Sequence, residues 1–364
     1  MPTKTFQPDY RNLVDAARRK RPARLPLYEH NVYPNVLEAA TGISFAHLRA
    51  GDATDQREYF RRYAQSLASL GYDVVPFEGC VTELVQGGEA LCGRAPALFS
   101  SVEEIERWPW DDFQRRYFER FGASFEALAD ALPPGMKAVA GVGNGVFETI
   151  QDFVPLTDLA YLEADDPDAY ALLWQKVADL LVATWRAFLG LAEDAPRTAS
   201  GAAYGDAFCL LRMGDDLGFK SSLLLRPETI RQHIIPAYAR VTALARAVDK
   251  PFLLHSCGCI FDVMEDLLTD ARIDAKHSNE DQIAPFADWL ERYGDRIALF
   301  GGIDMDFLCR ESPQAIGERV REVIRAAAPY PGFALGSGNQ IAEYVPPEGF
   351  LAMVNAVREC RGDY

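Results

Sequence analysis

Long apolar runs are absent from this sequence of 364 residues. No segment approaches the roughly 20 apolar residues that a helix needs to cross a bilayer, and residues 1–22 contain no apolar core of the signal-peptide type. We therefore expect a cytoplasmic protein without a membrane partner. Hydrophobic residues make up 49% of the chain and aromatic residues 11%, which favours a compact globular enzyme.

An excess of positive charge is also missing. The chain has 37 Lys and Arg residues against 53 Asp and Glu residues, a formal net charge of −16. Such a surface repels a phosphate backbone, so nucleic acid is excluded as a partner. One basic cluster lies at the end of the predicted first helix, and we interpret it as a solvated helix end in preference to an anion site. It consists of Arg18, Arg19, Lys20, Arg21 and Arg24.

Cysteines are few, and their number, seven, is odd. They are spread along a long chain, which argues against a disulfide framework. No linker rich in Pro, Gly or Ser and no internal repeat divides the sequence. We therefore expect one domain over residues 1–364, with an N-terminal helical extension at about residues 1–22.

Short apolar runs alternate with helical patterns along nearly the whole chain. Eight buried strands, each followed by a helix, predict a single (β/α)8 TIM-type barrel, whose active site lies at the carboxyl ends of the strands. A doubly wound open sheet is the alternative, but the GVGNG at residues 141–145 does not continue as GxGxxG, and we interpret it as a tight turn. The predicted strands are residues 24–29, 72–78, 137–143, 207–214, 251–257, 272–278, 296–302 and 332–338.

One strand ends on a histidine and a cysteine two positions apart. Alternate side chains of a strand share a face, so His255 and Cys257 point the same way. Imidazole and thiolate are preferred zinc donors, and Glu280, near the end of the next strand, offers a carboxylate as third ligand. Gly258 begins a turn, which disfavours Cys259 as a further ligand. A hydrogen-bonded core histidine beside a buried cysteine is the alternative interpretation.

Other polar residues follow the predicted strands and suit acid–base or substrate-binding roles. Asp215 and Asp216 follow the fourth strand, where a capped turn is the alternative role. Glu29 and His30 close the first strand. The candidates for substrate contact are Asn339, Tyr344, Glu148 and Asp304.

Several motifs resemble the uroporphyrinogen decarboxylase superfamily. They are GDDLG at residues 214–218, LHSCG at 254–258, ERYGDRIALFGGID at 291–304 and GSGNQIAEYVPPE at 336–348. The superfamily includes the decarboxylase and the zinc-dependent methyltransferases that work with methylated corrinoid proteins, and cobalamin-independent methionine synthase is a more distant relative. The chain resembles the methyltransferase-like branch more than the true decarboxylase.

The decarboxylase receives its polycarboxylate substrate with an arginine-rich segment after the first strand. Residues 28–36 here read YEHNVYPNV, without arginine, so decarboxylation of uroporphyrinogen is disfavoured because the anionic substrate would lose its counter-charges.

The resemblance also implies a zinc site. The methyltransferase branch holds zinc with an HxC pair, matched by His255 and Cys257, and with a cysteine in a later turn, where this chain has Ser337. The methionine synthase relative adds a glutamate, which Glu280 would supply, with His277 as reserve.

These features predict a metal-dependent methyltransferase, with zinc as the expected metal, that moves a methyl group between a small substrate or thiol and a carrier. The carrier would be a corrinoid on a separate protein, or folate. Two alternatives stay open: a decarboxylase or lyase of a non-porphyrin carboxylate that uses Asp215, Asp216 or Glu29, and a non-catalytic ligand-binding barrel. The outward helix faces allow either a monomer or a homodimer.

Overall fold

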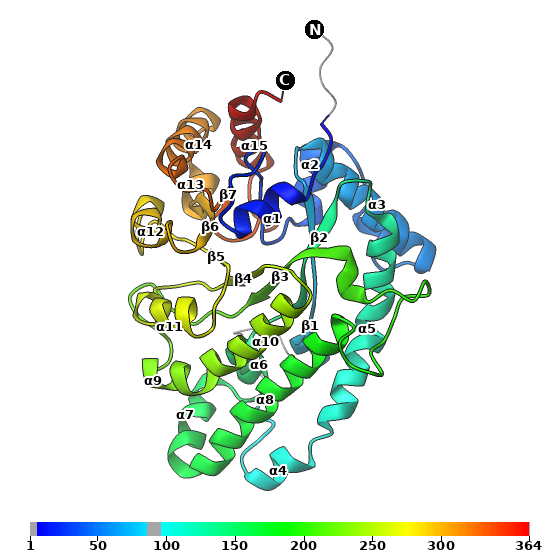
Figure 1. Ribbon diagram of the computed structural model, residues 1–364, viewed down its shortest axis with the longest axis vertical. Helices are drawn as coiled ribbons and strands as arrows, with labels where there is room; N and C mark the ends of the chain where they lie inside the picture. Colours follow the sequence, from blue (N-terminus) through cyan, green and yellow to red (C-terminus); the bar gives the residue numbers. More distant parts are fainter. Residues whose placement is uncertain (1–5, 86–95, 364) are drawn as a thin grey trace.

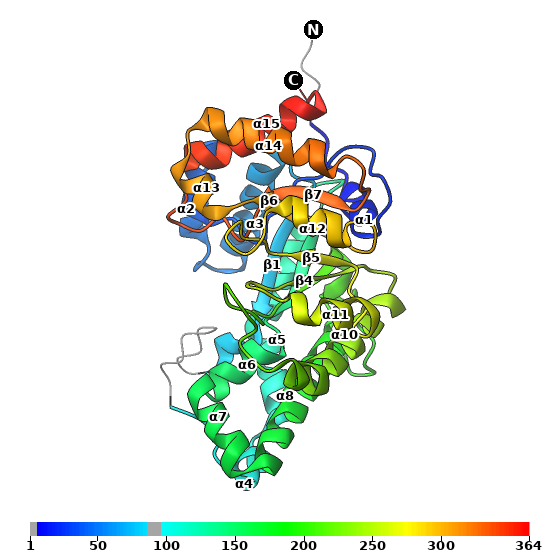
Figure 2. The same ribbon diagram turned by 90° about the vertical axis from the view of Figure 1, so that its left-hand side faces the viewer.

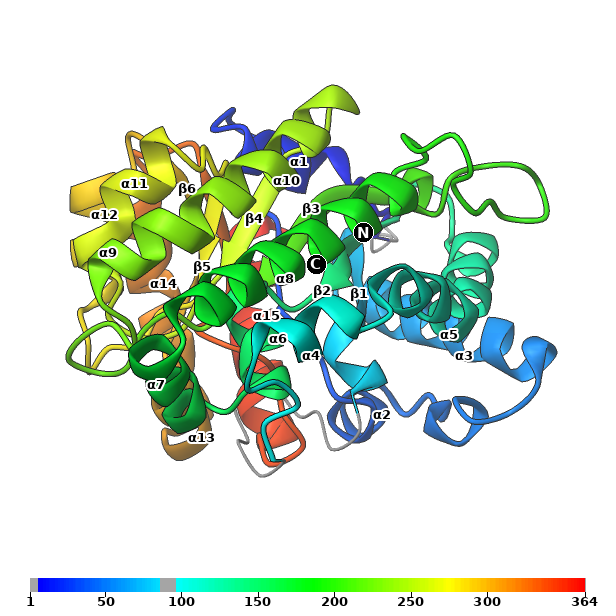
Figure 3. The same cartoon turned by 90° about the horizontal axis from the view of Figure 1, so that it is seen from below.

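Seven parallel strands form one sheet at the centre of the molecule, in which neighbours in the chain are neighbours in the sheet. The computed structural model describes residues 6–85 and 96–363. The sheet curls into a TIM-type α/β fold with its helices outside (Figures 1 and 3), as the sequence predicts. The strands are β1 (Val74–Cys80), β2 (Lys137–Gly143), β3 (Phe208–Gly214), β4 (Phe252–His255), β5 (Ala275–His277), β6 (Ala298–Ile303) and β7 (Phe333–Ser337).

The strands form where the sequence has short, continuous apolar runs. Every residue of β3, β4, β6 and β7 is buried, which is typical of parallel strands that are covered on both faces. Seven of the eight predicted strands are therefore confirmed.

The prediction of a full strand at residues 24–29 is wrong. This segment makes one parallel bridge, between Leu27 and Leu335 of β7, with a hydrogen bond from Tyr28 N to Leu335 O of 2.9 Å. Pro26 has no N–H group, so the ladder cannot continue through it. The segment still places Glu29 and His30 beside the end of β7.

Helices follow most of the strands. Among the described residues, no helix has both the length and the apolar composition of a membrane span. The α-helices are α1 (Arg11–Ala17), α2 (Pro34–Thr41), α3 (Ala53–Ser69), α4 (Val102–Arg107), α5 (Trp110–Ala131), α6 (Val146–Phe153), α7 (Leu156–Asp165), α8 (Pro167–Phe188), α9 (Pro227–Thr229), α10 (Ile235–Ala247), α11 (Met264–Thr269), α12 (Phe286–Tyr293), α13 (Met305–Arg310), α14 (Pro313–Ala327) and α15 (Pro347–Arg361). The short helical turns are η1 (Ala46–Leu48), η2 (Val81–Leu84), η3 (Tyr204–Ala207), η4 (Ile230–Ile234) and η5 (Phe261–Val263).

Local signals in the sequence account for several helix boundaries. Ser312 caps α14, because its hydroxyl accepts a hydrogen bond from Ala315 N at 3.2 Å. The helical segment formed by α9, η4 and α10 is irregular at the π-helical turn η4, just ahead of Pro236, which cannot donate a hydrogen bond within a helix. Figures 1 and 2 show α4 and α7 at the end of the molecule opposite the chain termini.

The six described cysteines are free thiols, and Cys92 lies outside the described residues.

Candidate functional site

The carboxyl ends of β3, β4, β5 and β7 bring the predicted site residues together. The strand register sets Gly214 beside His255 and His255 beside His277. The chain has only five histidines, and three of them, His30, His255 and His277, have ring nitrogens within 4.8 Å of one another.

The hydrogen bonds of His277 fix the tautomer of His255. His277 Nε2 lies 2.9 Å from the carbonyl oxygen of Ser337, which only accepts, so Nε2 carries the proton. In the neutral ring His277 Nδ1 then accepts, and the 2.7 Å contact between the two Nδ1 atoms requires His255 Nδ1 to donate. His255 Nε2 is therefore left with a free lone pair. Burial lowers the pKa of both rings, that of His277 to about 3, which keeps them neutral.

The free lone pair of His255 faces Cys257. His255 Nε2 and Cys257 Sγ are 3.4 Å apart. Two ligands of one tetrahedral zinc ion, at typical Zn–N and Zn–S lengths, lie about 3.5 Å apart. The pair therefore fits a single ion. The Nδ1 atoms of His255 and His277 are closer than the about 3.3 Å expected of two nitrogen ligands, so their geometry is that of a hydrogen bond, and His277 orients His255.

Asp216 completes a set of three donors with the predicted pair. Its Oδ1 lies 3.9 Å from His255 Nε2 and accepts a hydrogen bond from Cys257 N at 2.8 Å. Asp216, His255 and Cys257 form one of the two groups of described residues that could hold a metal ion. Nitrogen, sulfur and carboxylate oxygen are all zinc donors, so the residues fit a zinc ion.

Glu280, which the sequence suggested as third ligand, belongs to neither group of described residues. Ser337 also faces elsewhere, because its hydroxyl donates to Glu29 Oε2 at 2.5 Å. The third-ligand role of Glu280 stays a prediction, and the geometry favours Asp216.

Cys257 is held by further polar contacts. Asn339 Nδ2 donates to its sulfur at 3.3 Å, and Ser278 Oγ at 3.6 Å. Burial raises the pKa of the Cys257 thiol well above its usual value, and Asp216 raises it further. Burial also lowers the pKa of the neighbouring Lys276 to about 8. The thiol therefore needs a bound cation to ionise near neutral pH.

Asp215, predicted as an acid or base, is fully buried in a hydrogen-bond network. Its carboxylate accepts from Phe147 N at 3.1 Å, from Glu148 N at 2.8 Å and from Tyr238 Oη at 2.5 Å. The two backbone donors belong to the first turn of α6, so Asp215 caps this helix. A Cβ at Gly145 would overlap the Asp215 side chain, which explains the glycine. Asp215 thus has a capping role, but for α6, which precedes β3 in the chain, whereas the predicted capped turn leads to the helix that follows.

The predicted substrate contacts separate into different environments. Glu148 is buried, and its Oε1 accepts from Asp216 N at 3.0 Å; burial, Asp216 and Asp215 raise its pKa. Asp304 caps α13 through Asp306 N and Phe307 N. Tyr344 is 69% exposed. Of the four predicted substrate contacts, Asn339 and Glu148 each contact a proposed metal ligand: Asn339 the sulfur of Cys257, and Glu148 the backbone N–H of Asp216.

Glu29 lies behind Ser337 and is 2% exposed. Besides the Ser337 hydroxyl, its carboxyl group accepts from Ser337 N at 3.2 Å and from Tyr72 Oη at 3.3 Å. Burial raises the pKa of Glu29 to about 8.

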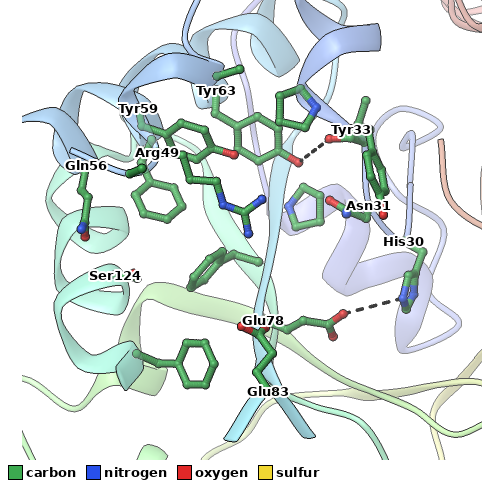
Figure 4. Close-up of a pocket in the computed structure, with 18 of the residues that line it drawn as sticks. His30, Asn31, Tyr33, Arg49, Gln56, Tyr59, Tyr63, Glu78, Glu83 and Ser124 are labelled. Carbon is green, nitrogen blue, oxygen red and sulfur yellow. Dashed lines mark hydrogen bonds and ion pairs between the residues drawn. The ribbon is translucent and has the colours of Figure 1, made fainter. Parts of the chain in front are cut away.

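His30 links the candidate metal ligands to a cavity of about 790 Å³ (Figure 4). Its ring lies against that of His255, with centroids 3.9 Å apart, and its Nε2 lies 3.8 Å from Glu78 Oε1. Glu78 pairs with the buried Arg212 at 2.8 Å. His30, Glu78 and Arg212 all line the cavity. Burial and Arg212 lower the pKa of His30 well below its usual value, so the ring is neutral.

Sequence reasoning missed Arg212, although a signal was present. It is a charged residue inside the buried run FCLLRMG, and a buried charge requires a partner. Arg49 and the tyrosines that line the cavity come from segments without a recognisable motif.

Comparisons with known proteins identify the family and the fold of the chain. The family model described as uroporphyrinogen decarboxylase (URO-D) matches residues 166–360, which include β3 to β7. Among solved structures, a methyltransferase from Methanosarcina mazei has a TM-score of 0.66 at 18% identity, covering 96% of this chain and 98% of that chain. At this identity the likeness shows a shared fold.

Curated relatives match over a short segment. The uroporphyrinogen decarboxylase of Magnetococcus marinus is 38% identical over 69 residues, and that of Azoarcus sp. is 33% identical over 66 residues. The matched part spans only 19% and 18% of the length of these two relatives. The family match, by contrast, extends over more than half of the chain. The protein therefore belongs to the uroporphyrinogen decarboxylase family.

Proposed function

We propose that the protein is a metal-dependent methyltransferase that moves a methyl group between a small substrate or thiol and a corrinoid or folate carrier. The observation that carries this proposal is the 3.4 Å separation of His255 Nε2 and Cys257 Sγ, with the Asp216 carboxylate beside them. Family membership and the fold shared with a methyltransferase support it. The carrier, if a corrinoid, would arrive on a separate cytoplasmic protein, and residues 1–364 would act as one domain.

His255, Cys257 and Asp216 would hold the metal. Bound zinc supplies a Lewis acid that lowers the pKa of a thiol or polarises a leaving group.

The chain's own residues prepare this centre. His277 and the Ser337 carbonyl keep the lone pair of His255 Nε2 directed at Cys257, as hydrogen-bonded partners of metal-binding histidines do. Asn339 donates to the Cys257 sulfur and stabilises its thiolate.

The cavity beside His30 would hold the substrate. The ring of His30 forms part of the cavity wall, while its Nδ1 is buried and has no hydrogen-bond partner among the described residues. Glu78 lies within reach to orient the ring.

The alternative, a decarboxylase or lyase, has weaker support. Asp215 is occupied by three hydrogen bonds, and Glu29 lies behind Ser337 and is shielded from solvent. Neither carboxyl group faces the cavity that His30 lines. Asp216 is the one carboxylate of the three that is partly exposed.

The first test is the metal content of the purified protein, freed of chelator, by mass spectrometry. We expect about one zinc per chain in the native protein, loss of zinc in Cys257→Ala and Asp216→Asn, and retention in Glu280→Gln. Cys259→Ala is the matched control, because this thiol lies two positions away and forms part of neither metal-binding group in the described part of the chain. Loss of zinc in Glu280→Gln but not in Asp216→Asn would show that Glu280, and not Asp216, is the third zinc ligand.

Activity is tested by supplying methylcobalamin or methyl-folate with a set of thiols and following methyl transfer. The native protein should transfer the methyl group, and Cys257→Ala should not. If neither the native protein nor Cys257→Ala contains metal after zinc is supplied, the proposal is overturned.

A further inference from the structure

The net charge of the residues that line the 790 Å³ cavity is opposite in sign to the net charge of the chain. Among the described residues that line it, three arginines, Arg49, Arg120 and Arg212, face two glutamates, Glu78 and Glu83, whereas the whole chain carries a formal charge of −16. The cavity therefore carries an excess of one positive charge.

The ion pairs within the cavity leave Arg49 as the residue that carries the excess positive charge. Arg212 pairs with Glu78 at 2.8 Å, and Arg120 lies 3.8 Å from Glu83. Arg49 forms no ion pair with the residues that the structure describes. Figure 4 shows its guanidinium group pointing into the cavity, between the tyrosines on one side and Glu78 on the other.

Aromatic side chains supply much of the remaining wall. Helix α3 contributes three of them, and two of these, Tyr59 and Tyr63, lie with their ring planes within 20° of each other. Flat rings of this kind favour stacked or edge-on contact with another ring. The aromatic residues that line the cavity are Tyr33, Tyr59, Phe60, Tyr63, Phe77 and Phe121.

The volume limits the size of the ligand. Sites for small organic molecules measure about 300 to 1,000 Å³, and this cavity lies within that range. A ligand with many carboxylates would leave all but one of them without a counter-charge, because the other two arginines are already paired. Burial of unpaired carboxylates is costly, so the ligand should carry a single one.

We infer that the cavity binds a small aromatic acid with one carboxylate, which Arg49 receives through its planar, two-pronged donor group. The ring lies among the aromatic side chains, and the opposite end of the molecule faces His30 and Glu78. This inference deepens the proposed function, since it takes this cavity as the substrate site of the methyltransferase.

The test uses two probes of equal shape, 2-naphthoate and the neutral 2-naphthamide, and measures their dissociation constants by isothermal titration calorimetry at fixed ionic strength. We expect naphthoate to bind at least tenfold more tightly than naphthamide. Arg49→Gln should remove this preference, while naphthamide binding stays unchanged. Arg57→Gln is the matched control: it removes one positive charge from α3, and Arg57 does not line the cavity.

Two further variants separate the possible failures. Arg49→Lys keeps the charge but loses the planar donor pair, and should give an intermediate preference. Cys257→Ala removes a proposed metal ligand and should bind naphthoate as the native protein does, so binding is measured independently of methyl transfer. No preference for naphthoate in the native protein, or an undiminished preference in a folded Arg49→Gln variant, would overturn the inference.

Discussion

Glu29 should make the stability of the protein fall as pH rises from about 4.5 to 8. It is buried, and burial raises its pKa from its usual 4.5 to about 8. The folded state therefore keeps this proton over a pH range in which the unfolded state has lost it. Stability from this group is fully present below pH 4.5 and is lost as pH rises through 8.

The size of the effect follows from the shift. One pKa unit corresponds to about 1.4 kcal/mol, so a shift from 4.5 to about 8 gives an upper limit of about 5 kcal/mol for the total change. Relaxation around the charged group and water entry reduce this limit. We expect a difference of about 2 to 4 kcal/mol between pH 5 and pH 9.

Glu29→Gln isolates the contribution, because glutamine has the shape of the protonated side chain and does not titrate. The free energy of unfolding is measured with urea at several pH values between 5 and 9. At pH 5 the two proteins should differ by less than about 1 kcal/mol, and at pH 9 the variant should be the more stable. Parallel pH profiles for the two proteins would refute the reasoning.

Two more predictions concern the site itself. Asp215→Ala should lower the free energy of unfolding by about 2 to 4 kcal/mol, because three buried donors lose their acceptor. Asp216→Asn should lower it by less than about 1 kcal/mol but should remove the metal. Urea unfolding and metal content are measured on both variants, and the opposite pattern, with metal loss in Asp215→Ala and the larger destabilisation in Asp216→Asn, would contradict this division of roles. His277→Phe should weaken zinc binding about 10- to 100-fold in a competition titration. Ser337→Ala keeps the backbone carbonyl and should bind zinc as the native protein does. An equal loss of zinc affinity in both variants would instead indicate that the serine hydroxyl is a ligand.

The strands could be predicted from sequence because burial on both faces leaves a continuous apolar run, as in β3 and β7. The exception is residues 24–29, where the run is apolar but Pro26 limits the pairing. The alternation argument for His255 and Cys257 applies only in part, because β4 ends at His255 and Cys257 follows it. The 3.4 Å between His255 Nε2 and Cys257 Sγ is nevertheless compatible with the expected shared direction.

The remaining features of the candidate site depend on turns and on distant segments. Glu280 follows β5 by three residues, and the direction of its side chain is set by a loop that no periodicity describes. Asp216 is held in place by the backbone N–H of Cys257, a contact between segments 41 residues apart. Arg49 reaches the cavity from a turn after η1. Spacing in the sequence carries no information on such contacts.

The serine at position 337 gives the proposed metal site a different ligand set from that of the methyltransferase branch. A cysteine there would add a second thiolate, as the resemblance to the methyltransferase branch implies. In this chain the Ser337 carbonyl holds His277, and its hydroxyl and N–H hold Glu29. If Asp216 is the third ligand, one carboxylate replaces one thiolate, and the formal charge of the ligand set stays the same. The softness of the set falls, because oxygen is a harder donor than sulfur. The site should therefore discriminate less sharply than a two-thiolate site between zinc and harder first-row ions such as cobalt and manganese, and competition of these ions against zinc in the native protein and in Asp216→Cys would measure that difference.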